Sequence, residues 1–158
     1  RVLTFTKYFL PASFEKDFPG AMDLAATSIP YMRTGLWKET KTNPLNHVES
    51  SKDHIEAALK ASFTPPEMDI LRAIVLQQHK ITDYAGMDSE KGNILVNAVR
   101  KANWVDITMG LVRFGLPASL LEAAYEELNS AGFHRIVWER HTKPPSSIIT
   151  GVLNVVKW

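Results

Sequence analysis

The sequence predicts an all-α protein, a single compact bundle of seven to eight helices that spans residues 1–158. The main observation is a stripe of apolar side chains between residues 90 and 113, which recur at steps of four, three, four and three. Its members are Ala98, Ala102, Val105, Met109 and Val112. A second observation is Thr64-Pro-Pro-Glu67, where threonine can cap a helix and glutamate can reach back to it. Outside 147–156, which could be helix or strand, no segment indicates a strand.

The other elements follow from helical spacing and from helix-breaking residues. We expect helices over residues 1–10, 21–32, 50–61, 66–80, 90–113, 117–128 and 133–140. Pro11 should stop the first helix, and Pro30 should kink or end the second. The polar segment from Thr34 to Val48 contains Gly, Asn and Pro and is expected to be a loop.

Composition excludes several classes of protein. Hydrophobic residues make up 45% of the 158-residue chain, and 18 basic residues face 17 acidic ones. This balance gives no strong field, so we expect no nucleic-acid partner. No apolar stretch approaches the roughly 20 residues that a membrane span needs, so we expect no membrane partner. The chain has no cysteine, which excludes disulfides and thiolate zinc sites and fits a cytoplasmic location.

The chain opens at Arg1, without Met, inside a stretch that is typical of a regular element. We therefore expect that an N-terminal piece is missing from this sequence. The apolar residues of 147–156 could contact a second subunit, so a homo-oligomer is possible.

A polar stripe lies beside the apolar stripe of the long predicted helix. Asn103, Asp106, Gly110 and Arg113 follow one another at steps of three, four and three, which keeps them on one face. An amide, a carboxylate and a guanidinium on a partly buried face could line a polar pocket. Equally, a buried Asp106–Arg113 network could serve only to fix helix packing.

His79 and Lys80 end the predicted helix over 66–80, where cations are favoured, so one interpretation is simple capping. His79 also lies eight residues after Leu71, close to the buried face, and could act as an acid or base near neutral pH. The other histidines are not expected to take part in chemistry. His47, His54 and His141 lie in polar surroundings and are expected to be exposed, and His134 is expected to form a hydrogen bond at a helix start.

Several segments together resemble a microbial branch of the HD-domain superfamily. The main one runs Ala98-Val-Arg-Lys-Ala-Asn-Trp-Val-Asp106 and continues Ile-Thr-Met-Gly-Leu-Val-Arg-Phe-Gly-Leu-Pro117, where relatives typically read RRADWVD…GLVRFGLP. Gly132-Phe-His134, Leu76-Gln-Gln-His-Lys80 and the opening Arg-Val-Leu-Thr-Phe-Thr add to it. The likeness covers most of residues 1–140, in the expected order, and implies an HD-domain-like helical bundle.

The resemblance implies a metal site whose ligands have been replaced. Working relatives bind one or two divalent metals through a His ahead of the opening, an adjacent His-Asp pair and a later Asp on the long helix. The His-Asp pair stands in a phrase like AYHDIGLWT, which matches Pro30-Tyr-Met-Arg-Thr-Gly-Leu-Trp37 here. Met32 thus stands in place of the His, Arg33 in place of the Asp, and Asn103 in place of the later Asp.

These replacements disfavour a divalent ion. Arg33 would remove an attractive carboxylate and add a permanent positive charge. Two unit charges about 4 Å apart interact by roughly 4 kcal/mol at an effective dielectric near 20, and the value doubles for a divalent ion. We therefore expect no metal and no cofactor, with Arg33 holding an anionic group of a ligand or pairing with Asp106.

Three functions are compatible with this pattern. The favoured one is a metal-independent lyase, isomerase or cyclase of small-molecule (specialised) metabolism. In it Arg33 binds an oxyanion, His79 is acid or base, and Asp106 orients one of them. Further ligand contacts are expected from Met32, Trp37, Lys80, Asn103, Arg113 and His134. The alternatives are a catalytically inactive protein that binds a ligand or partner, and a residual metal-dependent phosphohydrolase or hydratase.

Overall fold

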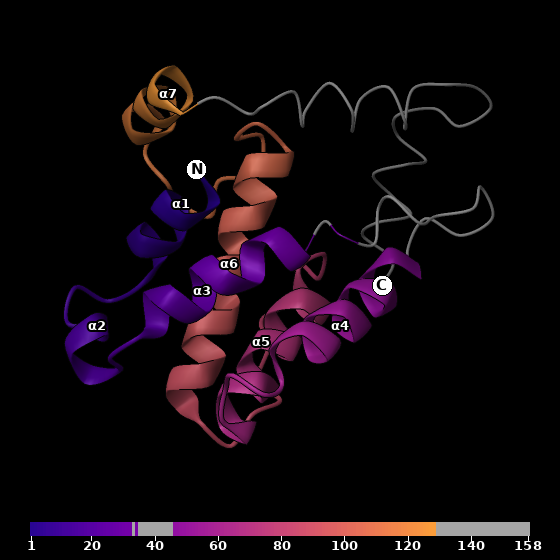
Figure 1. The fold of residues 1–158 in the computed structure, drawn as a ribbon. Helices are drawn as coiled ribbons and strands as arrows, with labels where there is room; N and C mark the ends of the chain where they lie inside the picture. Colours follow the sequence, from indigo (N-terminus) through magenta and orange to yellow (C-terminus); the bar gives the residue numbers. More distant parts are fainter. Residues whose placement is uncertain (33, 35–45, 129–158) are drawn as a thin grey trace, which may run out of the picture.

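The computed structural model describes residues 1–32, Thr34 and residues 46–128, and it is all-helical in this part of the chain. Figure 1 shows the arrangement of the helices. They are α1 (Val2–Phe9), α2 (Phe14–Asp17), α3 (Ala21–Tyr31), α4 (Asn46–Leu59), α5 (Pro65–Gln77), α6 (Glu90–Ile107) and α7 (Ala118–Glu127). The prediction of an all-α bundle is confirmed. Within the described ranges no helix combines the length and the apolar character that crossing a membrane requires.

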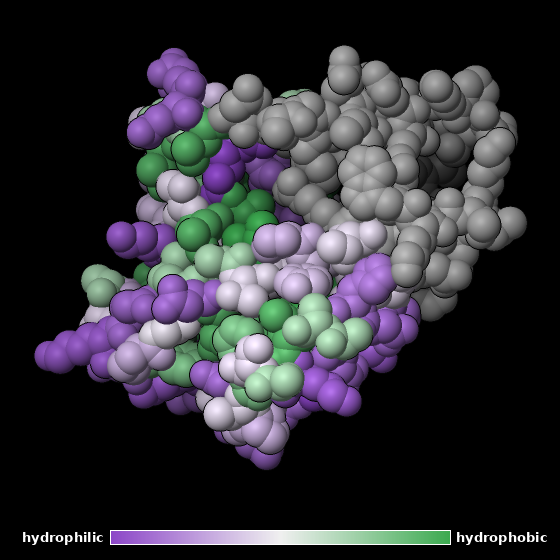
Figure 2. All heavy atoms as spheres, viewed as in Figure 1, coloured by the Kyte–Doolittle hydropathy of each residue, from purple (hydrophilic) through white to green (hydrophobic). Residues whose placement is uncertain are grey.

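The longest helix, α6, organises the bundle. Its contacts with α1 and α5, and those of α3 with α4 and α5, join the helices into one body (Figure 1). α4 and α5 pack side by side and are joined by a short turn, so they run antiparallel. Hydrophilic residues gather over the outer surface of α4 (Figure 2), as expected of a helix that buries only one face.

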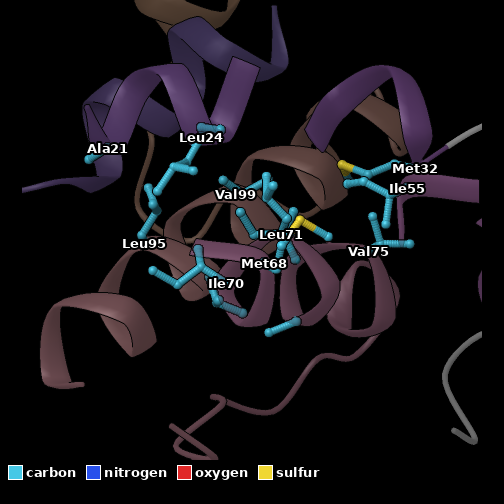
Figure 3. Packing of buried hydrophobic residues seen from close by; sticks show 14 of the residues in the cluster. Ala21, Leu24, Met32, Ile55, Met68, Ile70, Leu71, Val75, Leu95 and Val99 are labelled. Carbon is cyan, nitrogen blue, oxygen red and sulfur yellow. The ribbon is translucent and has the colours of Figure 1, made fainter. Parts of the chain in front are cut away.

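The core consists of two clusters along α6. The first lies between α3, α4, α5 and the beginning of α6, and Figure 3 shows its packing. Leu24, Ile55, Leu71 and Val99 are among its members, each 4% exposed or less. The second cluster joins α1 and α7 to the later part of α6. It contains Val2, Phe5, Ala102, Val105, Leu116 and Ala124.

The helix start predicted at Thr64 is confirmed. The backbone N–H of Thr64 donates to the Glu67 carboxylate at 2.8 Å, and the Thr64 hydroxyl lies 2.7 Å from the same oxygen. The two form a reciprocal capping box with proline in the first turn. Hydrogen bonding from the Thr64 hydroxyl, and then from its backbone, lowers the pKa of Glu67.

Several predicted boundaries are wrong. The helix expected over 50–61 begins earlier, at Asn46. The loop predicted from Thr34 to Val48 therefore included residues that belong to this helix. The short helix α2 was not predicted, because four residues are too few to show a period. The helix expected over 66–80 ends at Gln77. The segments 133–140 and 147–156 lie outside the described residues.

The largest error concerns α6, which ends at Ile107 rather than at residue 113. Met109 has a φ of +50°. The N–H of Gly110 donates to the carbonyl of Val105 at 2.9 Å, and the N–H of Met109 donates to the carbonyl of Asp106. This pattern is a Schellman motif, which closes the helix and satisfies carbonyls of its last turn. Met109 is consequently 57% exposed and does not extend the apolar stripe.

Candidate active site

The most distinctive polar feature of the described residues is a pair of histidines. The Nε2 atoms of His47 and His79 lie 2.9 Å apart. Their ring planes are inclined by 72°, with centroids 5.0 Å apart. His47 is only 5% exposed, and His79 is half-buried. An imidazole pair at this distance can hold or transfer a proton.

The fold explains why these two residues meet. His47 lies in the first turn of α4, and His79 follows the last residue of α5 by two positions. Because the two helices pack antiparallel, the beginning of α4 lies beside the end of α5. His79 was predicted to lie close to the buried face of a helix over 66–80; it is half-buried, but α5 ends at Gln77, so helical spacing does not account for its position.

The prediction that His47 is exposed is wrong. His47, Ser51 and Ile55 are all buried, at 5%, 0% and 0% exposure, and their spacing of four residues puts them on one face of α4. His54, also predicted to be exposed, is half-buried, with Nδ1 3.4 Å from the Thr34 hydroxyl. The four-residue spacing is visible in the sequence. The predicted helix began at residue 50, however, so His47 was not counted as part of its buried face.

The backbone on both sides of His79 is held by α6. The amide of Asn103 donates to the carbonyl of Gln78 at 3.0 Å, and the indole of Trp104 donates to the carbonyl of Lys80 at 3.1 Å. Asn103 is 2% exposed. Its amide is a donor here, a role that a carboxylate at this position could not fill. Asn103 therefore positions the segment that carries His79.

Arg100 extends this anchoring and was not foreseen from the sequence. Its side chain is 1% exposed and donates to the carbonyls of Lys80 and Ile81 and to the carboxylate of Asp83. Burial lowers the pKa of Arg100, and the negative charge of Asp83 opposes that shift. Asn97 adds two hydrogen bonds to the backbone of Tyr84, each 2.8 Å long. The signal was a second polar stripe at helical spacing, formed by Asn93, Asn97, Arg100 and Trp104.

Asp106 is buried as predicted, but its described partner is Arg1. The Arg1 Nε donates to the Asp106 carboxylate at 2.7 Å, and both side chains are under 10% exposed. Arg1 also donates to the carbonyl of Leu128 at 2.8 Å and lies over the ring of Tyr125, 4.8 Å from its centroid. The Asp106–Arg113 network is wrong, because α6 ends before Arg113, which is exposed in the following loop.

The remaining predicted site residues are distributed as follows. Met32 is 2% exposed and lies in the first core cluster beside Ile55 (Figure 3). Lys80 has a half-buried side chain and contributes its carbonyl to Arg100 and Trp104. Arg33, Trp37 and His134 lie outside the described residues, as does His141, so their predicted roles and a pairing of Arg33 with Asp106 stay predictions.

Tyr125 provides a pH-dependent test of the environment around Asp106. Burial, and then the negative charge of Asp106, raise the pKa of Tyr125 to about 12, with Arg1 acting in the opposite direction. The folded protein therefore keeps this proton at a pH where the unfolded chain, with a tyrosine pKa of about 10, has lost it. The stabilisation is complete below the unfolded value and is lost as pH rises through the folded one.

We expect Tyr125→Phe to flatten the loss of stability between about pH 10 and 12 relative to the unchanged protein. The measurement is the urea midpoint at a series of pH values. Tyr8→Phe, at a tyrosine that is 46% exposed, is the matched substitution with which the slope of Tyr125→Phe is compared. Equal slopes for the unchanged protein and Tyr125→Phe would refute the buried environment of this hydroxyl.

Among the described residues, no group of three or more His, Cys, Asp or Glu side chains is arranged to hold a metal ion. Comparisons with known proteins found no matching family model, no curated relative and no similar solved structure. The likeness to HD-domain proteins therefore stays a prediction from the sequence.

Proposed function

We propose that this chain is a metal-independent enzyme that transfers a proton on a small organic molecule, in a lyase, isomerase or cyclase reaction on an HD-domain-like scaffold. The observation that carries the proposal is the His47–His79 pair, whose Nε2 atoms are 2.9 Å apart. Imidazole is the side chain whose ordinary pKa lies nearest to neutral pH, which suits general acid and base catalysis.

The burial of the two rings divides their roles. His79 is half-buried and can meet a substrate, so it is the acid or base. His47, at 5% exposure, supports it from within the bundle. Asp106 forms an ion pair with Arg1. We therefore give Asp106 the role of orienting another site residue, Arg33 or His79, and not that of reacting with the substrate. Arg33 keeps its proposed role as the group that binds an oxyanion of the substrate.

Two of the positions at which relatives carry metal ligands support metal independence. Met32 fills part of the core, and its thioether is a soft, neutral ligand that hard divalent ions do not favour. The Asn103 amide nitrogen already donates to the Gln78 carbonyl. The lack of cysteine supports the further proposal of a cytoplasmic enzyme that uses no thiolate chemistry.

The test is conversion of small molecules by chelator-treated protein. We would incubate it with a panel of small hydroxy acids, ketones and unsaturated carbonyl compounds and follow products by mass spectrometry and NMR. We expect a conversion that persists in chelator and falls at least about 100-fold in His79→Asn. His54→Asn, on the same helix as His47, is the matched control and should retain it.

Retained conversion in His79→Asn, with an unchanged melting temperature, would overturn the catalytic role of His79. A conversion that stops in chelator and returns with added metal would overturn metal independence and restore the hydrolase alternative.

A catalytically inactive binding protein is the second candidate, and the burial of Met32 in the core favours it. Such a protein would be stabilised by a particular small molecule without converting it. The same panel, followed by thermal unfolding, separates the two: a rise in melting temperature with no product supports binding alone.

A further inference from the structure

We propose that Gln78 is a ligand-binding residue whose side-chain amide nitrogen donates a hydrogen bond to a carbonyl oxygen of a small molecule inside the bundle. The inference rests on the proposed function and deepens it, because it names a class of substrate and a residue that recognises it. Gln78 was assigned no role from the sequence.

The Gln78 side chain is an amide that is buried without a hydrogen-bond partner. Gln78 is 1% exposed. Its Nε2 atom is shielded from solvent, and no acceptor lies within hydrogen-bond distance of it. A buried donor that stays unpaired lowers stability, so folded proteins keep few of them. The unpaired amide therefore indicates a group whose partner is a bound molecule.

The position of Gln78 directs this amide into the bundle. The backbone at Gln78 keeps helical angles, with φ at −54° and ψ at −26°. Leu71 and Val75 precede it by seven and three residues and are fully buried, so Gln78 ends the buried face of α5. Figure 3 shows Val75 beside Ile55 of α4 and Met32, which follows α3. The amide thus stands at the end of an apolar interior.

Two other amides of the protein show what a purely structural role looks like. The Asn97 amide donates to the carbonyl of Tyr84 at 2.8 Å, and the Asn103 amide donates to the backbone carbonyl of Gln78 at 3.0 Å. Each supplies a donor that a loop carbonyl needs. The Gln78 amide nitrogen serves no such carbonyl, which separates it from the structural amides.

The surroundings define the part of the ligand that meets Gln78. A carboxylate would lose its hydration among apolar side chains and gain only one neutral donor, whereas a carbonyl oxygen is satisfied by that donor. The ligand must be small, because the amide is covered, and we expect the flexible side chain of Met32 to move aside for it.

A donor to a carbonyl oxygen suits the proposed class of reaction. When a proton is taken from the carbon beside a carbonyl group, negative charge develops on the oxygen. A hydrogen bond aimed at that oxygen stabilises the charge. Gln78 is therefore expected to bind the substrate and to favour its loss of a proton.

The first measurement is urea unfolding of Gln78→Met, with Gln77→Met as the matched control. Methionine is similar in size, has no donor and leaves the backbone bond to Asn103 intact. We expect Gln78→Met to lower the equilibrium constant of unfolding at least about fivefold, because the unpaired amide is removed. Gln77→Met makes the same change at a half-buried neighbour and should not show this gain.

The second measurement is a titration with acetone, a small carbonyl compound, followed by ¹H–¹⁵N correlation NMR. The side-chain amide signals of Gln78 are identified by their loss in Gln78→Met. We expect these signals to shift with saturation at millimolar acetone in the unchanged protein and in Gln77→Met. Backbone signals around residue 78 should move with them, and should stay in place in Gln78→Met.

Equal or lower stability of Gln78→Met than of Gln77→Met, including failure to fold, would overturn the proposal, because the amide would then be satisfied in the folded protein. A titration without a saturable shift of the Gln78 amide would overturn it too. Neither measurement uses turnover. Acetone binding at Gln78 without conversion of any substrate would reject only the enzyme, and conversion without acetone binding would reject only the role of Gln78.

Discussion

Arg100→Met is expected to lower the free energy of unfolding by about 3 kcal/mol. The methionine keeps most of the buried volume but removes the charged hydrogen bonds to the carbonyls of Lys80 and Ile81. The Ile81 carbonyl would lose this charged donor, and the segment that carries His79 would lose one of its anchors to α6. Urea unfolding followed by circular dichroism measures the change.

Asp83→Asn is the control that separates the buried contacts from the ion pair. The Asp83 side chain is 72% exposed, so its pairing with Arg100 is screened by water, and the loss should stay below about 1 kcal/mol. A loss in Asp83→Asn as large as that in Arg100→Met would mean that the ion pair, and not the backbone contacts, fixes the segment.

Gly110→Ala is also expected to lower the free energy of unfolding by about 3 kcal/mol. Gly110 has a φ of +80°, which costs any side chain about 1 kcal/mol or more. An added Cβ would also lie 2.2 Å from Cδ2 of Leu121, so the half-buried Leu121 side chain would have to change its conformation. Overpacking of this kind adds about 1–3 kcal/mol.

Gly115→Ala measures the backbone strain alone, so its difference from Gly110→Ala gives the contribution of the contact with Leu121. Gly115 has nearly the same φ, +84°, but an added Cβ would meet nothing within 4 Å. We expect a loss of only about 1 kcal/mol. Combining Gly110→Ala with Leu121→Ala should recover part of the difference. Equal losses for the two single glycine variants in thermal unfolding would show that contact with α7 does not constrain this loop.

Local signals in the sequence predicted the fold class well. The capping box before α5, the stop at Pro11 and the periods of α3 and α6 each depend on residues within a few positions of one another. The end of α6 was missed because apolar residues continue at helical spacing through Met109 and Val112. The competing signal was Gly110, which adopts a φ of +80° without strain directly after Met109, the residue that closes the helix with a φ of +50°.

The candidate site was only partly predictable. His79 and Asp106 were expected near buried faces, and both are buried at least in part. Their described partners were not foreseen, because His47 and Arg1 lie 32 and 105 residues away in the chain. No periodicity reports contacts at such separations. The error with Arg113 followed from the error in the end of α6, since a residue beyond the helix no longer shares its face.

Arg100 shows a different limit. In the sequence it is the one charged member of a polar stripe on a long helix, and charged residues are rarely buried. Its burial depends on the loop after α5, whose carbonyls need donors once they lie against α6. A requirement set by another segment cannot be read from the residue itself.

The most direct test of metal-independent acid–base chemistry at the His47–His79 pair is metal titration of chelator-treated protein by calorimetry, with Zn²⁺, Mn²⁺ and Fe²⁺ in turn. We predict no stoichiometric binding at micromolar metal, because the two Nε2 atoms face each other at 2.9 Å and no third His, Asp or Glu side chain of the described residues is placed to complete a metal site with them. One equivalent of tightly bound metal that is lost in His79→Asn would contradict the account.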